Sequence, residues 1–139
     1  MNNLIVADYD VGIISSLASD AQLQSRPIDD GRYAFSIPDM LQQKLAIRPH
    51  LLFVPDLRAR ARQFPALVVQ VLADTNARFY AEREMHDFRT CLVEGGFAPR
   101  LSVGDEPVYV HPAQTSSELE HGIREFSSAV RSAVYWRRA

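Results

Sequence analysis

Apolar runs alternate with segments of helical spacing along the whole chain. Runs of consecutive or alternating apolar residues predict strands, and they occur at 4–7, 33–37, 51–54, 66–73 and 108–110. Apolar residues three and four positions apart predict helices between these runs, at 13–21, 38–47, 77–93 and 116–136. Gly95 and Gly96 mark the end of the third helix, and Pro49 marks the end of the second.

Five strand and helix units follow one another without a repeat or a linker. Residues 57–64 are predicted to form a short helix or turn, and residues 97–107 fit no single element. The run at 66–73 is apolar nearly throughout, as expected of a central parallel strand covered on both faces. The pattern therefore predicts a single α/β domain over residues 1–139, with a doubly wound (βα)5, flavodoxin-like three-layer sandwich around a parallel five-stranded sheet.

Composition narrows the classes of partner. The chain has 139 residues, of which 47% are hydrophobic and 23% charged, and these fractions are typical of a soluble globular domain. A net charge of -2 gives no reason to expect nucleic acid or an anionic membrane as partner. No apolar run approaches the roughly 18 residues of a membrane span. We expect a protein partner or a second copy of the chain.

Cys91 is the only cysteine, so the chain contains no internal disulfide and a reducing, cytoplasmic location is expected. Its position in the apolar phase of a predicted helix indicates a buried, inert thiol. The first residues lack a basic region before their short apolar run, which favours a first strand over a signal peptide.

Polar side chains follow several of the predicted strands. In a doubly wound parallel sheet, functional residues gather outside the carboxyl ends of the strands. The residues at these positions are Asp8, Asp10, Asp56, Asp74, Thr75 and His111.

The segments Leu4–Asp10, Arg48–Arg58 and Val108–Pro112 carry a resemblance to the receiver domains of response regulators. The resemblance implies that Asp8, Asp10 and Asp56 would bind Mg²⁺ through carboxylate oxygens, with Asp56 as phosphoryl acceptor. It also implies a switch hydroxyl, which falls on Thr75, and a lysine after the last strand, where this chain has His111.

These departures from the receiver pattern indicate weakened phosphotransfer. Lys44 is the only lysine, and His111 is mostly neutral near pH 7, so it would pair poorly with a phosphoryl oxygen. Asp56 comes one residue late, which turns its side chain to the other face unless the strand is bulged. The resemblance is therefore to a pseudo-receiver, a phosphorylation-independent signalling or regulatory protein-interaction domain, with no cofactor expected unless the carboxylates hold Mg²⁺.

The same resemblance implies a contact surface made by the fourth helix, the fifth strand and the fifth helix. Tyr109, Tyr135 and Trp136 would contribute aromatic side chains to it, a residue type enriched at interface hot spots.

A second resemblance is to haloacid-dehalogenase-type phosphatases. It rests on Asp8-Tyr9-Asp10, on Val71–Asn76 and on Val103–Glu106, and implies Asp8 as nucleophile and Asp10 as general acid/base with Mg²⁺. That family has a lysine after its second motif, but no lysine lies beyond Lys44 in this chain. The sequence therefore favours a domain without catalysis and keeps the phosphatase as the alternative. The structural alternative for the aspartates is a role as helix caps, and for His111 an ordinary position at a strand end.

Overall fold

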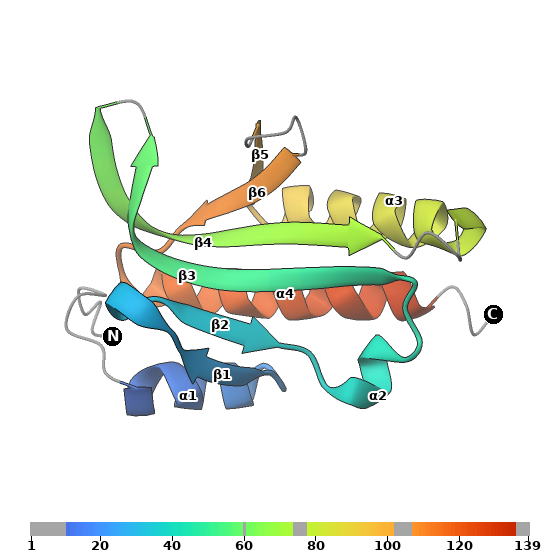
Figure 1. Cartoon of the computed structure of the whole chain (residues 1–139), viewed down its shortest axis with the longest axis horizontal. Helices are drawn as coiled ribbons and strands as arrows, with labels where there is room; N and C mark the ends of the chain where they lie inside the picture. Colours follow the sequence, from blue (N-terminus) through green and yellow to red (C-terminus); the bar gives the residue numbers. More distant parts are fainter. Residues whose placement is uncertain (1–10, 60, 74–77, 102–106, 136–139) are drawn as a thin grey trace.

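Six strands form one antiparallel sheet, and three long helices lie against one of its faces (Figure 1). The structure is a computed structural model that describes residues 11–59, 61–73, 78–101 and 107–135. The strands are β1 (Gln24–Pro27), β2 (Tyr33–Ser36), β3 (Ile47–Ala59), β4 (Arg62–Ala73), β5 (Ala98–Leu101) and β6 (Pro107–Pro112). The long helices are α1 (Val11–Asp20), α3 (Arg78–Glu94) and α4 (Ser116–Tyr135), and the short ones are η2 (Asp29–Gly31) and α2 (Asp39–Gln42).

The prediction of a parallel, flavodoxin-like sheet is wrong. The strand order is β1-β2-β3-β4-β6-β5, and every neighbouring pair runs antiparallel. Antiparallel neighbours end at opposite edges of a sheet, so the ends of consecutive strands do not gather along one rim. Residues at the carboxyl ends of neighbouring strands therefore do not meet at one edge of this sheet, as a parallel sheet would have required.

The error arose at β3 and β4, which form one long hairpin. Residues 57–64, predicted as a short helix or turn, are its outer part, where Leu57 pairs with Phe64 and Ala59 with Arg62. The sequence pattern predicts a helix end at Pro49 and a strand end at Val54, just before Pro55. Proline cannot donate to a sheet ladder, so it is rare inside paired strands. Pro49 instead lies where β3 pairs with β4 alone, and Pro55 and Pro65 lie at the bulge, between the pairs Val54–Ala66 and Leu57–Phe64.

Other elements match their predictions closely. The predicted helices at 13–21, 77–93 and 116–136 are α1, α3 and α4, and the runs at 33–37 and 108–110 lie in β2 and β6. The fifth strand, β5, falls in the ambiguous stretch 97–107. The predicted first strand at 4–7 lies outside the described residues. None of the described helices combines the length and the apolar composition that crossing a bilayer would require.

Two of the helices end in the same hydrogen-bonded motif. At the end of α3, Phe97 N–H donates to Leu92 O over 3.0 Å and Gly96 N–H to Val93 O over 3.2 Å. Gly96 has φ +100°, a conformation that glycine adopts without strain. At the end of α1 the equivalent bonds run from Leu23 to Ala18 and from Gln22 to Ser19.

The core lies between the sheet and the helix layer. The sheet contributes side chains that are almost fully buried, and aromatic and aliphatic side chains of the helices pack against them. Phe88 of α3 and Phe126 of α4 meet edge to face, with ring centroids 5.9 Å apart. Ile47, Leu51, Phe53, Leu67 and Val69 form the central part of the sheet side of the core.

Both edges of the sheet are short strands that contain proline. β1 has Pro27 at its end, and β5 has Pro99 in its second position. A proline offers no N–H to a further strand, and a four-residue edge gives little length for pairing. The edges are therefore poor places for a partner to add a strand.

Candidate functional site

Of the polar residues predicted for the site, the structure describes Asp56 and His111. Asp8, Asp10 and Thr75 lie outside the described residues. Asp56 is exposed at the bulge of β3, and His111 lies on β6 with its side chain in the helix-facing layer. The bulge that the receiver interpretation required at Asp56 does exist, but the residue opens to solvent there.

His111 is a core residue and is only 5% exposed. It stands opposite Leu67 across the β4–β6 ladder, and its ring lies 5.0 Å from that of Phe97. Its Nδ1 lies 2.7 Å from the carbonyl oxygen of Pro112, which fixes Nδ1 as the donor. Burial lowers the pKa of His111, the Pro112 carbonyl acts in the opposite direction, and nearby His121 adds to the lowering. A neutral imidazole in the core is what the structural interpretation of this residue expects.

His121 of α4 links this histidine to the end of α3. The two imidazole rings are 5.4 Å apart, and His121 Nε2 lies 3.0 Å from Gly95 O, to which it donates. The carbonyl is one of those that a helix end leaves without a donor inside the helix. The histidine pair therefore joins β6, α3 and α4 and performs a structural task.

The cysteine and the interface aromatics also find places in the fold. Cys91 is half-buried on α3, and burial raises the pKa of its thiol, with the carboxylates of Glu125 and Glu94 adding to the effect. A raised pKa keeps the thiol protonated, as expected of an inert cysteine. Tyr109 is only 6% exposed and packs in the core, so it is not a surface residue. The side chains of Tyr135 and Trp136 are outside the described part.

Within the described ranges, no three His, Cys, Asp or Glu side chains gather closely enough to hold a metal ion. The carboxylates named for Mg²⁺ include Asp8 and Asp10, which those ranges leave out. Magnesium binding therefore stays a prediction from the sequence.

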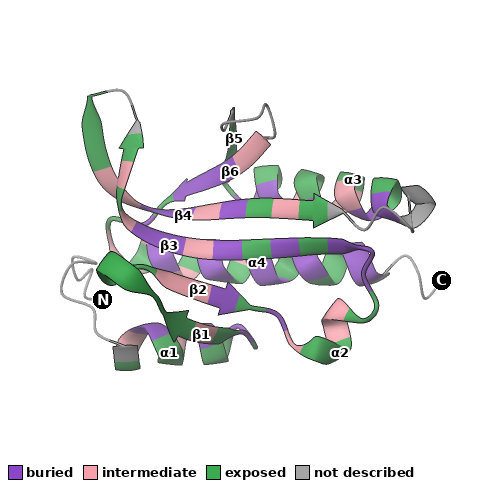
Figure 2. Ribbon diagram, in the orientation of Figure 1, coloured by how far each residue is buried: buried purple, intermediate pink, exposed green. Residues whose placement is uncertain are grey.

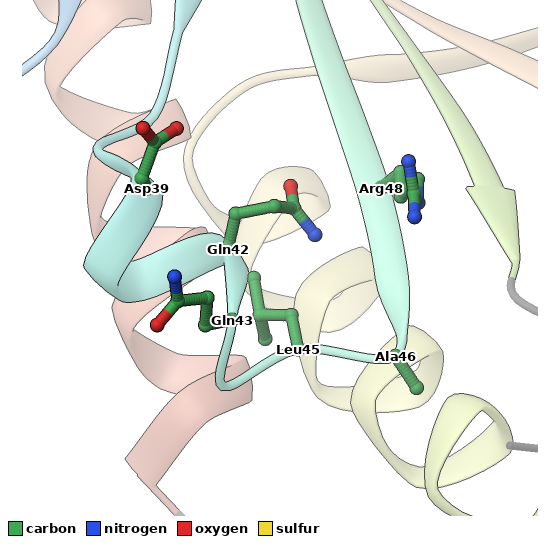
Figure 3. Close-up of a pocket in the computed structure, with 6 residues that line it drawn as sticks. All are labelled: Asp39, Gln42, Gln43, Leu45, Ala46 and Arg48. Atoms are coloured by element: carbon green, nitrogen blue, oxygen red, sulfur yellow. The ribbon is translucent and has the colours of Figure 1, made fainter.

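A hollow of about 330 Å³ lies where α2 leads into β3 (Figure 3). Figure 3 shows Gln42 directed toward β3, where its side-chain nitrogen donates to Ile47 O over 3.0 Å. The other residues around it are Asp39, Gln43, Leu45, Ala46 and Arg48. Among the described residues that line this hollow, Asp39 carries the single carboxylate and Arg48 the single positive charge, and both are exposed.

The face of the sheet away from the helices is the largest feature that the sequence did not predict. Along β3 and β4, buried positions alternate with exposed or half-buried ones (Figure 2). The exposed positions of β3 include Arg48 and His50, and those of β4 include Gln70 and Leu72. In Figure 1 the sheet lies in front of α4, so this open face is turned toward the viewer.

An apolar row crosses the open face at right angles to the strands. The register pairs Ala34 with Leu52, Leu52 with Val68, and Val68 with Val110. Ala98 on the edge strand β5 continues the row through its pairing with Val110. Paired residues point to the same face of an antiparallel sheet, so these side chains form one strip. Leu52 and Val68 in its middle are half-buried.

The exposure of the apolar side chains on the open face varies along the strands. Leu72, two strand positions beyond Gln70 on the same face, is 52% exposed, and Val108 is half-buried. At the bend of the hairpin, Val54 and Ala66 are buried. Val110, between Val68 and Ala98, is only 8% exposed. The accessible apolar surface therefore lies mainly around Leu52, Val68 and Leu72 on β3 and β4, with Val108 and Ala98 beyond Val110.

The side chains around the strip include three arginines and a histidine. Arg26 lies beside Ala34 on β1, Arg48 and His50 precede Leu52 on β3, and Arg100 lies opposite Val108 on β5. Asp56 at the bulge is the one acidic residue in the described strands. The described strands are therefore net positive, although the chain as a whole has a net charge of -2.

The sequence contained a signal for this face. Ile47, Pro49 and Leu51 are buried, and Arg48 and His50 between them are exposed. This alternation with a period of two is typical of a strand that has one face exposed to solvent. In β4 the apolar residues at 66–69 and 71–73 obscured the same alternation, because apolar side chains occupy the open face as well.

No protein-family model matches the chain, and neither a curated protein nor a solved structure is similar enough to match it.

Proposed function

We propose that this chain is a regulatory protein-binding domain without a reaction of its own, and that the open face of the sheet binds the partner. The observation that carries the proposal is the apolar strip Ala34–Leu52–Val68–Val110–Ala98, which the helix layer does not cover and which polar residues border. Val110 is buried within this strip, whereas Ala34, Leu52 and Val68 are half-buried and Ala98 is exposed. An exposed apolar patch with a polar rim is typical of a protein-binding surface.

Two further observations favour binding over catalysis. The titratable residues of the sheet that are best placed for chemistry are either buried in a structural role, as His111 is, or exposed singly, as Asp56 is. The face itself is built on regular strands, which hold side chains in fixed positions and suit a docking surface. With one cysteine and no internal disulfide, the domain fits a reducing, cytoplasmic location.

The test is selection of peptides from a random phage-displayed library on the full chain, followed by backbone amide mapping with ¹⁵N-labelled protein. We expect the selected peptides to shift amides of β3, β4 and β6. Replacing Leu72 by serine should weaken their binding about tenfold, because Leu72 is exposed beside the strip on the same face. Truncating one apolar contact of this kind costs on the order of 1–2 kcal/mol.

The matched control is Val93→Ser, since Val93 is 51% exposed on α3 and Leu72 is 52% exposed on β4. The control should leave binding unchanged. Peptides that map to the helix layer, or an equal loss with both variants, would show that the open face is not the binding surface.

A further inference from the structure

We propose that the partner segment on the open face is acidic, with aliphatic side chains set among Asp and Glu residues. The inference rests on the proposed function and adds the chemistry of the ligand. It follows from the juxtaposition of the apolar strip with Arg26, Arg48, His50 and Arg100 on one surface.

Charge complementarity is the first argument. The arginines on the open face are exposed, and they lie on β1, β3 and β5, so they border the strip along much of the sheet. Complementary potential across an interface steers association and selects the partner, whereas like charges oppose it. The carboxylates of an acidic segment would pair with these arginines, while its aliphatic side chains would cover the strip.

A nucleic acid fits this face less well than a protein segment. Proteins that bind single strands combine positive charge with aromatic side chains on which bases stack. The aromatic residues of the central strands, Tyr33, Phe35, Phe53 and Tyr109, belong to the helix-facing layer, and the apolar strip itself is aliphatic. Phe64, outside that layer, lies on the outer part of the hairpin.

A second copy of the chain also fits less well. A two-fold dimer would place the same patch of each copy against the other. Arg48 and Arg100 of one copy would then approach the basic rim of its partner, which like-charge repulsion opposes. Adding a strand at the edge is disfavoured because β1 and β5 are short and contain Pro27 and Pro99. Face-to-face dimers and strand addition are therefore both disfavoured, and a different, acidic chain fits the face better.

The experiment uses fluorescein-labelled synthetic peptides of equal length with the full chain. One peptide alternates Glu with Val, the second replaces Glu by Lys, and the third replaces Val by Ser. We expect the Glu–Val peptide to bind at least about tenfold more tightly than the other two, and its affinity to fall as salt is raised. Amide mapping should place it on β3, β4 and β6.

The decisive variant is the double charge reversal Arg48→Glu with Arg100→Glu, which should weaken binding of the Glu–Val peptide about tenfold. Its matched control is Arg89→Glu with Arg124→Glu, which makes the same change in net charge on exposed residues of α3 and α4. The control should bind as the unaltered chain does. Equal losses in both double variants, or equal binding of the Lys–Val peptide, would overturn the proposal.

Two outcomes separate this proposal from the function it rests on. Library peptides that occupy the open face without enrichment in Asp and Glu, and that tolerate the Arg48→Glu and Arg100→Glu changes, would overturn the acidic chemistry and keep the binding face. Polyuridylate that binds this face more tightly than the Glu–Val peptide would also overturn it, in favour of nucleic acid. If no peptide reaches the face, both proposals fail.

Discussion

Glu84 shows how a single side chain can hold two distant segments together. It is 0% exposed on α3, and its Oε1 accepts Ala46 N–H over 2.6 Å and Ile47 N–H over 3.0 Å. These amides lie where the chain enters β3, next to the hollow beside α2. Hydrogen bonds from buried amides to a carboxylate are among the stronger ones in proteins.

Replacing Glu84 by leucine should lower the free energy of unfolding by about 2–4 kcal/mol, because two buried amides lose their acceptor. Glu84→Gln keeps an acceptor oxygen and should cost less than Glu84→Leu. Urea unfolding of the full chain followed by circular dichroism measures both. If the leucine variant is as stable as the unaltered chain, the carboxylate does not anchor β3.

His111 gives the stability a dependence on pH. Its pKa is lower in the folded chain than its ordinary value of 6.5, chiefly through burial. The unfolded chain therefore takes up a proton more readily, and the stability present above about pH 6.5 is lost as the pH falls toward the folded-state pKa. His121, Glu118 and Glu125 are the titratable groups that act on it.

We expect the urea midpoint to fall more between pH 7.5 and pH 5.5 for the unaltered chain than for His111→Asn. The asparagine amide can take over the donation to Pro112 O without titrating in this range. A midpoint that falls equally in both proteins would mean that another group causes the acid sensitivity.

At the scale of elements, α1 is joined to α4 by a small polar cluster. Ser127 Oγ donates to Ala21 O over 2.8 Å and accepts from Arg131 Nη1 over 2.8 Å, and Arg131 also bonds to the side chain of Gln22. The Ala21 carbonyl follows the last turn of α1, where helix carbonyls lack intrahelical donors. The cluster therefore completes the end of one helix with the side chains of another.

Replacing Ser127 by alanine should lower stability by about 1–2 kcal/mol, because a buried carbonyl loses its donor. Faster hydrogen exchange should be confined to α1 and the turn after it. Ser128→Ala is the matched control, since Ser128 is the exposed neighbour on the same helix, and it should change stability by less than about 0.5 kcal/mol. Equal effects in the two variants would assign the change to helix propensity.

The helices could be predicted because each carries its own local signals. The stripe of α4 and the Gly95-Gly96 stop of α3 lie within a few turns of the chain. The direction of strand pairing is not local. Whether the runs at 51–54 and 66–73 pair as a hairpin depends on the residues between them, and the segment 57–64 there was predicted as a short helix or turn.

At the scale of the whole molecule, the wrong direction of strand pairing also led to the wrong candidate site. Parallel strands would have brought Asp56 and His111 to one rim, whereas the antiparallel sheet leaves one exposed and buries the other. The open face was hidden because Val68 and Leu72 are apolar on the wet side of β4. A sequence pattern reports hydrophobicity but does not report whether a helix or a partner covers it.

The prolines of the edge strands have a consequence for how this protein behaves in a crowded solution. An apolar, uncovered sheet is the kind of structure from which fibrils grow, since each copy can template the next through unpaired backbone groups. Pro27 and Pro99 interrupt that backbone row at the two ends of the sheet. The molecule can therefore keep apolar surface exposed for binding while its copies resist growth into cross-β aggregates.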